Sequence, residues 1–335
     1  MKKFLISGSA GFIASNIVKR ILANGDKVLG VDNFVSGQTE NVDEFMEDDN
    51  YEFVKGDLKE FQLCVEICSE VDYVIHQAAL GSVPRSVENP LMTSENNINS
   101  TLNLLFASSL QKVKRFVYAS SASVYGNIDR FAEGKFWDNL NQTYDHIKTD
   151  LRDERMILAP ANPYAVSKMA GEEYAKMFHS VYGLETISLR YFNVFGPRQN
   201  VNGPYAAVVP NFILRMLGDN DIEIHGNGKQ FRDFTFVENV VDANLAACNG
   251  KLGADAFGKA YNVGAGEKTS INQLVLKLSE LTGYKRKTNY VDSRLGDVFG
   301  NVADPTLAKN TLHFEAKTGI NEGLKETVKW YKENL

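Results

Sequence analysis

The first half of the chain alternates short, almost wholly apolar runs with segments of helical periodicity. Strands are predicted at residues 3–7, 27–32, 51–55, 72–77 and 115–120, and helices at residues 11–23, 61–69 and 90–110. A run such as Tyr73-Val74-Ile75 has no polar face, which indicates a strand that is buried on both sides. The alternation therefore predicts an α/β fold, with a Rossmann-like, doubly wound parallel sheet covered by helices.

The composition of the sequence changes in the second half. A helix from about residue 164 to 182 and a strand near residues 186–191 continue the alternation, but Gly, Pro and Asn become dense after about residue 195. Further helices are predicted at residues 206–217, 238–248, 270–282 and 319–332. We therefore expect two domains, residues 1–195 and a smaller mixed α/β lobe of residues 196–335, with some exchange of chain between them. A chain of 335 residues is long enough for both.

Composition argues against several classes of partner. The formal net charge is −6 and the pI is near 5.5, which disfavours a nucleic-acid or an anionic membrane surface. No apolar run reaches the length that spans a membrane. The apolar N-terminus runs into a Gly-rich turn, so we expect a first strand rather than an export signal. The three cysteines make neither a metal-ligand set nor a full disulfide set, which favours a cytoplasmic protein without a metal.

The segment from Gly8 to Ala14, GSAGFIA, lies between the first predicted strand and the first predicted helix. Glycine lets the backbone approach a diphosphate closely, and the N-terminus of a helix favours its negative charge. Asp32 ends the next strand at about the expected distance of ~20 residues, where a carboxylate binds the adenosine ribose. It would repel a 2′-phosphate, and no Arg or Lys stands in residues 33–37. The pattern therefore predicts NAD rather than NADP as the cofactor.

Two further strand ends belong to the same predicted site. Asp57 follows the third strand, where its carboxylate can meet the adenine amino group. Ala78 and Ala79 follow the fourth strand, and their small side chains leave room for a dinucleotide. Each of these positions, taken alone, is also typical of an ordinary turn at the end of a strand.

Ser121, Tyr164 and Lys168 are the candidate catalytic residues. The fifth strand ends in a Ser-rich run that includes Ser121 and Ser123, and ligands of open α/β sheets bind beyond the carboxyl ends of the strands. Tyr164 and Lys168 are one helical turn apart and so lie on one face. Lowering the pKa of a tyrosine from ~10 to ~7 takes roughly 4 kcal/mol, which a lysine and a positive nicotinamide ring could supply together. Because no nucleophile elbow or His base is assignable, Ser121 is interpreted as a hydrogen-bond donor rather than a nucleophile.

Together these motifs resemble the extended short-chain dehydrogenase/reductase superfamily over almost the whole chain. The resemblance rests on Gly8-Ser9-Ala10-Gly11, Ser121, Tyr164-x-x-x-Lys168 and Arg190-Tyr191-Phe192-Asn193. Within the superfamily, residues 79–86 and 193–210 look like those of bacterial UDP-N-acetylglucosamine 4-epimerases. The resemblance implies reversible C4 epimerisation of UDP-GlcNAc and UDP-GalNAc, extending to UDP-glucose and UDP-galactose.

The implied mechanism uses tightly bound NAD. Tyr164, as a phenolate, takes the proton of the C4 hydroxyl while a hydride leaves C4, the 4-keto sugar turns over, and the hydride returns to the opposite face. The resemblance also implies a homodimer, in which the helices at residues 90–110 and 164–182 pack against their copies as a four-helix bundle.

The motifs and the resemblance name two sets of residues. The cofactor-binding set is Gly8, Gly11, Phe12, Ile13, Asp32, Asn33, Asp57, Leu58, Ala78, Ala79, Asn96, Tyr164 and Lys168. The substrate-binding set is Gly81, Ser82, Ser123, Asn193, Gln199, Val209, Arg232, Arg294, Asp297 and Asn301.

Three of these positions have ordinary alternatives. Arg232 and Arg294 match diphosphate-binding arginines of the family, whose guanidinium groups suit phosphate oxygens. Each could instead form a surface ion pair, with Asp233 or Asp297. Asn301 matches the position of a gatekeeper, at which Tyr restricts the pocket to sugars without an acetyl group. The smaller Asn would admit an acetamido group, or it is simply a turn residue.

Other activities of the superfamily can be compared with single positions. Ala122 and Ser123 stand where sugar 4,6-dehydratases carry Asp-Glu and nucleotide-sugar decarboxylases carry a Glu nearby, so elimination would lack its proton carriers. A UDP-glucuronate 4-epimerase needs an Arg for the carboxylate, and Arg85 or Arg198 could serve. A non-catalytic NAD sensor would not need the Tyr–Lys pair, which is present.

One departure from the family pattern concerns substrate preference. Residues 127–153 make a longer connection than is usual, and Glu154 and Pro160 match the pattern again. Long loops in compact domains are often lids or interface elements. This connection precedes the catalytic helix and so bears on which sugar is accepted.

Overall fold

A seven-stranded sheet forms the centre of the computed structural model, which describes residues 1–126, 151–200, 207–292 and 300–334. The strand order is β12-β7-β5-β4-β1-β2-β3, and every neighbouring pair is parallel. The strands are β1 (Lys3–Ser7), β2 (Lys27–Asp32), β3 (Tyr51–Lys55), β4 (Tyr73–His76), β5 (Arg115–Ser121), β7 (Glu185–Tyr191) and β12 (Lys259–Val263). The predicted Rossmann-like parallel sheet is confirmed, and its first three strands have the predicted bounds.

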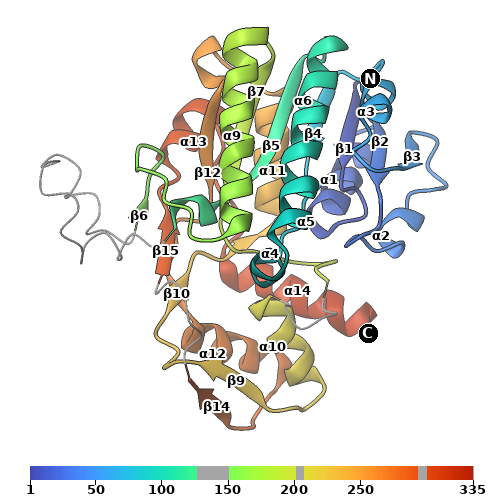
Figure 1. Cartoon of the computed structure of the whole chain (residues 1–335). Helices are drawn as coiled ribbons and strands as arrows, with labels where there is room; N and C mark the ends of the chain where they lie inside the picture. Colours follow the sequence, from blue (N-terminus) through green and yellow to red (C-terminus); the bar gives the residue numbers. More distant parts are fainter. Residues whose placement is uncertain (127–150, 201–206, 293–299, 335) are drawn as a thin grey trace, which may run out of the picture.

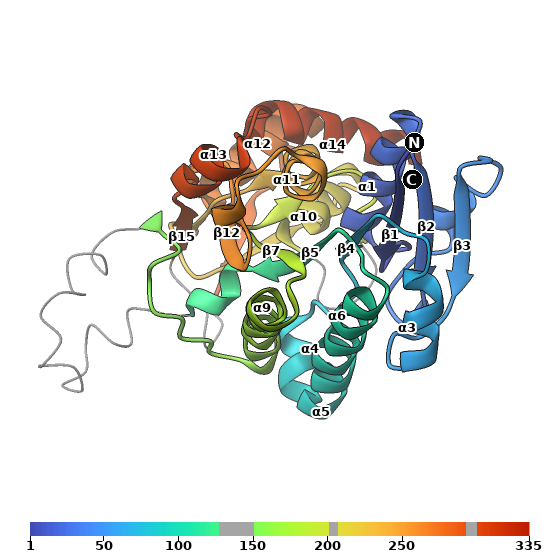
Figure 2. The ribbon, with the colours of Figure 1, turned by 90° about the horizontal axis from the view of Figure 1, so that it is seen from above.

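Helices cover both faces of this sheet (Figures 1 and 2). One face carries α3 (Phe61–Cys68), α6 (Ser100–Leu110) and α9 (Pro163–Tyr182), and the other carries α1 (Phe12–Ala23), α11 (Val237–Asn249) and α13 (Thr306–Leu312). In β1, Phe4 and Ile6 pack into the core on the α1 side, whereas Leu5 packs into the core on the α6 side. All three are fully buried, which is why the strand has no polar face.

The helix predicted at residues 90–110 is built from three pieces. These are α5 (Pro90–Ser94), a π-helical turn (Glu95–Asn99) and α6. A π-helical turn inside a helix often marks a functional position, and this one carries Asn96. Two short helices, α2 (Glu40–Asp43) and α4 (Val83–Glu88), were not predicted because four to six residues show no helical periodicity.

The chain after residue 195 divides between the central sheet and a separate core. Of its elements, α11 and β12 pack in the layers of the central sheet. The helices α10 (Val208–Leu217), α12 (Ile271–Thr282) and α14 (Ile320–Asn334) pack around the separate core, lower in Figure 1. Three small sheets accompany the central one. The first has four strands, in the order β13 (Thr269–Ser270), β10 (Phe231–Arg232), β15 (Gly300–Ala303) and β6 (Leu151–Arg152). The other two are pairs: β11 (Thr235–Phe236) with β8 (Val194–Phe195), and β14 (Thr288–Val291) with β9 (Ile222–His225).

No helix in the described ranges is both long enough and apolar enough to cross a membrane. No group of three or more His, Cys, Asp or Glu residues in these ranges is placed to hold a metal ion. Cys64, Cys68 and Cys248 are buried free thiols.

Candidate active site

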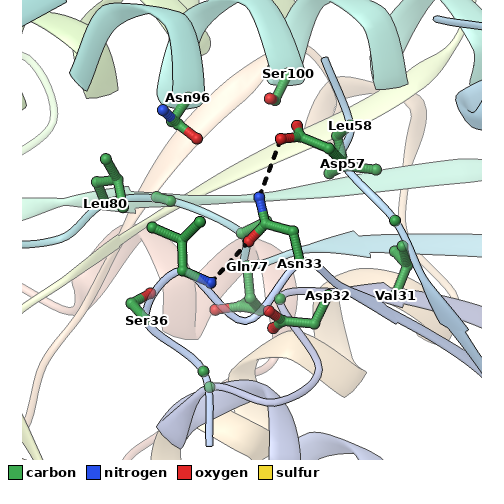
Figure 3. A pocket seen from close by; sticks show the side chains of 17 residues that line it. Val31, Asp32, Asn33, Ser36, Asp57, Leu58, Gln77, Leu80, Asn96 and Ser100 are labelled. Carbon is green, nitrogen blue, oxygen red and sulfur yellow. Dashed lines mark hydrogen bonds between the residues drawn. The ribbon is translucent and has the colours of Figure 1, made fainter. Parts of the chain in front are cut away.

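A cavity with about 610 Å³ of empty volume, part of it open to solvent, lies at the carboxyl ends of β1 to β4 (Figure 3). Parallel strands bring their carboxyl ends to one edge of a sheet, so residues far apart in the sequence meet there. Of the predicted cofactor residues, the cavity is lined by Gly8, Gly11, Asp32, Asn33, Asp57, Leu58, Ala78, Ala79 and Asn96. Phe12 and Ile13 lie in the first turn of α1, half-buried against the core of the second lobe.

The turn between β1 and α1 requires glycine at Gly8. Its φ is +69°, a conformation that residues with a side chain rarely adopt. A Cβ at this position would also lie only 2.8 Å from the backbone of Ala78, after the neighbouring strand β4. The turn therefore brings the backbone after β1 close to the backbone after β4 at the edge of the cavity.

Asp32, at the end of β2, is held rigidly beside the Gly-rich turn. Its carboxylate accepts hydrogen bonds from the backbone N–H of Ala10 at 3.1 Å and of Phe34 at 2.7 Å. Burial raises the pKa of Asp32, and these backbone hydrogen bonds oppose that increase. Close by, the Asn33 side-chain amide donates to the Asp57 carboxylate at 3.3 Å (Figure 3). Acceptors fixed in this way suit the hydroxyl and amino groups of an adenosine, so the two carboxylates fit NAD.

Helix α9 places Tyr164 and Lys168 beside the end of β5. The helix begins at a precise point because the Asn162 side chain accepts a hydrogen bond from Ala165 N at 2.9 Å and Pro163 occupies the first turn. An N-cap of this kind is worth about 0.5–2 kcal/mol. The helix lies so close to β5 that a Cβ at Gly171 would come within 2.2 Å of the Tyr118 hydroxyl.

Lys168 is almost fully buried, with 4% of its surface exposed. Its ammonium donates to the carbonyl of Ala119 in β5 at 2.7 Å, and Nζ lies 5.9 Å from the centre of the Tyr164 ring. Burial lowers the pKa of Lys168 to about 7, although the negative charge of Glu172 raises it. The predicted face shared by Tyr164 and Lys168 is therefore present, and the lysine is the residue whose pKa is depressed.

Tyr164 behaves differently from the expectation. Burial raises its pKa, and the hydrogen bond with the Ser121 side chain opposes this only in part. The charge of a nearby lysine favours the phenolate, but burying a phenolate costs free energy, and here burial has the larger effect. A lowered pKa is thus not a property of the polypeptide alone, and it would have to come from the positive nicotinamide ring.

We expect the buried ammonium to make stability depend on pH. Between pH 7 and about 10.5 an unfolded lysine binds a proton that folded Lys168 does not, so stability falls as the pH falls through that range. Lys168→Met removes this dependence. The free energy of unfolding of the natural protein, relative to the variant, should rise by about 2 kcal/mol from pH 7 to pH 9. Urea unfolding at both pH values measures it, and parallel pH profiles would contradict the depressed pKa.

Two buried residues near Lys168 were missed by the sequence analysis. His76 joins Ser7 Oγ at 2.6 Å and Thr101 Oγ1 at 2.9 Å, and burial, together with the charge of Lys168, lowers its pKa to about 3. Glu172 accepts two hydrogen bonds from Arg190, at 2.7 and 2.9 Å. A lone His or a Glu in a helix gives no sequence signal that it will be buried and hydrogen-bonded, because only the fold buries it.

The predicted substrate residues occupy several elements. Gly81 is exposed, and Ser82 begins α4 by accepting a hydrogen bond from Arg85 N at 3.3 Å. The Asn193 amide donates to the Asp233 carbonyl at 3.3 Å. Val209 is buried in the first turn of α10.

Three side chains of the predicted substrate set contain a buried polar atom without a partner. Within the described ranges, Ser123 Oγ, Gln199 Oε1 and Asn301 Oδ1 form no hydrogen bond. Leaving a buried polar group unpaired costs about 1–3 kcal/mol. Such atoms are therefore candidates for contact with a ligand.

Arg232 and Asn301 face each other across neighbouring parallel strands, β10 and β15, as register partners. Asp233, the predicted alternative partner of Arg232, is fully buried, and its carboxylate accepts backbone hydrogen bonds from Ala265, Gly266 and Ala303 at 2.9–3.0 Å. Those bonds fix β15 against β10. The predicted diphosphate-binding and gatekeeper positions are thereby held side by side.

Some predicted positions lie outside the described residues. These are Arg294, Asp297 and most of the long connection at residues 127–153. Glu154, the first residue after that connection, is described. Its carboxylate accepts a hydrogen bond at 2.7 Å from the backbone N–H of Asn262 in β12.

Solved structures of nucleotide-sugar epimerases share this fold and most of its length. A UDP-glucose 4-epimerase of Thermotoga maritima, solved with UDP-glucose, is 35% identical, with a TM-score of 0.86 and 99% of each chain covered. A UDP-N-acetylglucosamine 4-epimerase of Methanobrevibacter ruminantium, solved with UDP-N-acetylmuramic acid, is 34% identical, with a TM-score of 0.87 over 100% of this chain and 99% of the other. The UDP-glucuronate 4-epimerase of Thermodesulfobacterium geofontis is 33% identical over 100% of this chain and 98% of its own.

The sequence also matches a protein family directly. Residues 4–264 match the NAD dependent epimerase/dehydratase family. The family is NAD-dependent, which confirms the cofactor that the Gly-rich turn and Asp32 predict. With most of its length matched, and with relatives above 30% identity along the whole chain, the chain belongs to the NAD-dependent epimerase/dehydratase family.

Proposed function

We propose that this protein interconverts UDP-GlcNAc and UDP-GalNAc by reversible epimerisation at C4. The observation that carries the reaction type is the group formed by Ser121, Tyr164 and Lys168 at the end of β5, next to a cavity that fits NAD. Ala122 and Ser123 follow Ser121, so no carboxylate stands beside it for an elimination. Proton transfer at one hydroxyl is the chemistry that this group supports.

Each residue of the group has a distinct part in the proposed reaction. The Tyr164 hydroxyl exchanges a proton with the C4 oxygen of the sugar, and the Ser121 hydroxyl holds that oxygen. The ammonium of Lys168, fixed by the Ala119 carbonyl, places positive charge behind the phenol. NAD, when bound, supplies the acceptor and donor of the hydride at C4. Lys168 is almost fully buried, which limits the access of water to the positive charge beside the phenol.

The preference for an acetylated sugar rests on Asn301. It lies beside Arg232, so a sugar whose diphosphate binds the arginine would extend past the Asn301 side chain. The unpartnered Oδ1 of Asn301 can accept the N–H of an acetamido group. Asn is also much smaller than the Tyr that restricts this position in related enzymes.

A UDP-glucuronate 4-epimerase is the second candidate, since one of the relatives above has that activity. Such an enzyme needs a cation for the sugar carboxylate. Arg198 is 7% exposed by its side chain, pairs with Glu44 near α2 and stacks over the ring of Phe45 at 5.4 Å. Its charge is thus already used, which argues against Arg198 for this role and leaves Arg85, exposed in α4, as the other candidate.

We expect the purified protein to convert UDP-GlcNAc without added NAD. The hydride that leaves C4 returns to the same molecule, so the cofactor is regenerated in each cycle and can stay bound. UDP-GlcNAc, UDP-glucose and UDP-glucuronate, each incubated alone with the protein, separate the candidate substrates in one chromatographic assay. A requirement for stoichiometric NAD⁺ with release of a keto sugar would indicate a dehydrogenase, and turnover of UDP-glucuronate alone would favour the second candidate.

We further propose a homodimer through α5, α6 and α9, which lie side by side on one face (Figures 1 and 2). Large apolar side chains are exposed on these helices: Leu91, Phe106, Leu110, Val166, Val181 and Tyr182. An exposed apolar surface of this kind usually marks an interface, and a two-fold dimer is the commonest oligomer.

The proposed dimer predicts a mass of twice 37.3 kDa in light scattering at micromolar concentration. Val181→Glu, on the exposed face of α9, should shift the mass toward that of the monomer. Each protomer would then bury one new negative charge in the proposed interface. Lys176→Glu changes charge on the same helix at an exposed position that forms only a weak ion pair, and it serves as the control. A monomeric mass for the natural protein would refute the proposal.

A further inference from the structure

Gln77 lines the cofactor cavity but was not among the predicted site residues. It follows β4 directly, and its backbone N–H donates to the Ser7 carbonyl at 3.2 Å, which fixes the position of its Cα. Figure 3 shows its side chain among those that line the cavity. Its neighbours Ala78 and Ala79 have no polar side chain, so Gln77 brings the only side-chain hydrogen-bonding group of this three-residue stretch.

The Gln77 amide is oriented from behind by two buried residues. Its nitrogen, Nε2, donates to the Tyr191 hydroxyl at 2.8 Å and to Asn244 Oδ1 at 3.1 Å. Tyr191 ends β7, and Asn244, on α11, is fully buried. The anchor of Gln77 therefore comes from two elements that are distant from it in the sequence.

The direction of the amide follows from a backbone carbonyl. The carbonyl oxygen of Val240 can only accept, and Asn244 Nδ2 donates to it at 2.7 Å. Asn244 must then present Oδ1 to Gln77, and an oxygen there selects the NH₂ end of Gln77 rather than its oxygen. Within the described residues no hydrogen bond uses Gln77 Oε1. The network thus leaves an acceptor, not a donor, for the cavity that Gln77 lines.

We propose that Gln77 Oε1 accepts a hydrogen bond from a hydroxyl of the nicotinamide-side ribose of NAD, and that Tyr191 and Asn244 are its positioning residues. A diphosphate offers only acceptors, so it cannot be the partner of this oxygen. The order of groups along the sheet agrees with the order along the dinucleotide. Asp32 ends β2 and suits the adenosine ribose, the turn at Gly8 follows β1 and suits the diphosphate, and Gln77 follows β4, on the far side of β1.

Gln77→Met tests the acceptor, since Met has nearly the same length and no oxygen. Displacement of NADH, followed by its fluorescence, compares NAD, ADP-ribose and ADP on each protein. ADP lacks the second ribose and serves as the internal control for damage to the adenosine side. We expect NAD and ADP-ribose to lose about 3- to 10-fold in affinity relative to ADP, as is typical for one neutral hydrogen bond. An equal loss for ADP, or no loss for ADP-ribose, would overturn the proposal.

Tyr191→Phe tests the positioning role without changing any residue that lines the cavity. It removes one of the two anchors of Nε2, so the affinity for ADP-ribose relative to ADP should fall, but less than in Gln77→Met. Tyr261→Phe is the matched control. Tyr261 lies in β12, the strand adjacent to β7, and its buried hydroxyl donates to Ala256 O at 2.8 Å. Equal behaviour of the two Tyr→Phe variants would overturn the positioning role. Tyr191→Phe also gives a reading on the acceptor if Gln77→Met does not fold.

Discussion

Tyr164→Phe should lower kcat at least 10²- to 10⁴-fold, the range typical of a lost general acid–base group. The substitution removes only the hydroxyl, which sits at the end of β5 in a hydrogen bond with Ser121. The ring remains to fill its place at the start of α9, so the fold and the cavity for NAD should be retained. The decisive measurement is the rate of UDP-GlcNAc epimerisation at saturating substrate.

The matching control is Tyr174→Phe on the same helix. Tyr174 packs against the core beneath α9, ten residues beyond Tyr164, and has no place in the proposed chemistry. Bound NAD and the thermal midpoint should be the same in both variants, while only Tyr164→Phe loses turnover. Near-normal turnover in Tyr164→Phe would show that another group moves the proton.

The central sheet was predictable because burial leaves a local trace. Strands covered on both faces must be apolar throughout, so β1 and β2 could be placed from single runs of residues. The strand β12 left a weaker trace, since the fully buried Asn262 within it is polar. Asn262 is tolerated in the interior because its amide donates to the Arg152 carbonyl and accepts from the Tyr125 hydroxyl, each at 2.7 Å, and no local pattern reveals these contacts.

The members of the candidate site were easier to predict than their electrostatics. The spacing of Tyr164 and Lys168 follows from helix geometry, and so does the side of the sheet that they reach. Burial shifts the pKa values of both residues, and the charge of Glu172 acts on that of Lys168; the spacing contains neither effect. For the same reason no local pattern indicates that Gln77 is anchored by Asn244, from another part of the chain.

Asn301→Tyr should reverse the preference between acetylated and non-acetylated sugars. Asn301 is half-buried in β15, next to Arg232, so a larger side chain there would fill space at the substrate rather than extend into solvent. Overpacking commonly costs ~1–3 kcal/mol. If the acetamido group meets this cost in the transition state, kcat/KM for UDP-GlcNAc falls roughly 5- to 150-fold.

UDP-glucose carries only a hydroxyl where UDP-GlcNAc carries the acetamido group, so it should lose little activity in Asn301→Tyr. The ratio of the two kcat/KM values within one variant therefore cancels general damage to the fold. Asn301→Ser is the control for the lost amide, because it removes the same Oδ1 but leaves the space open. We expect it to keep UDP-GlcNAc as a substrate, with a smaller loss from the missing hydrogen bond. Equal losses on both sugars in Asn301→Tyr would mean that Asn301 does not select the substrate. The unpartnered Gln199 Oε1 would then be the next position to test, since it is the other buried amide oxygen of the predicted substrate set.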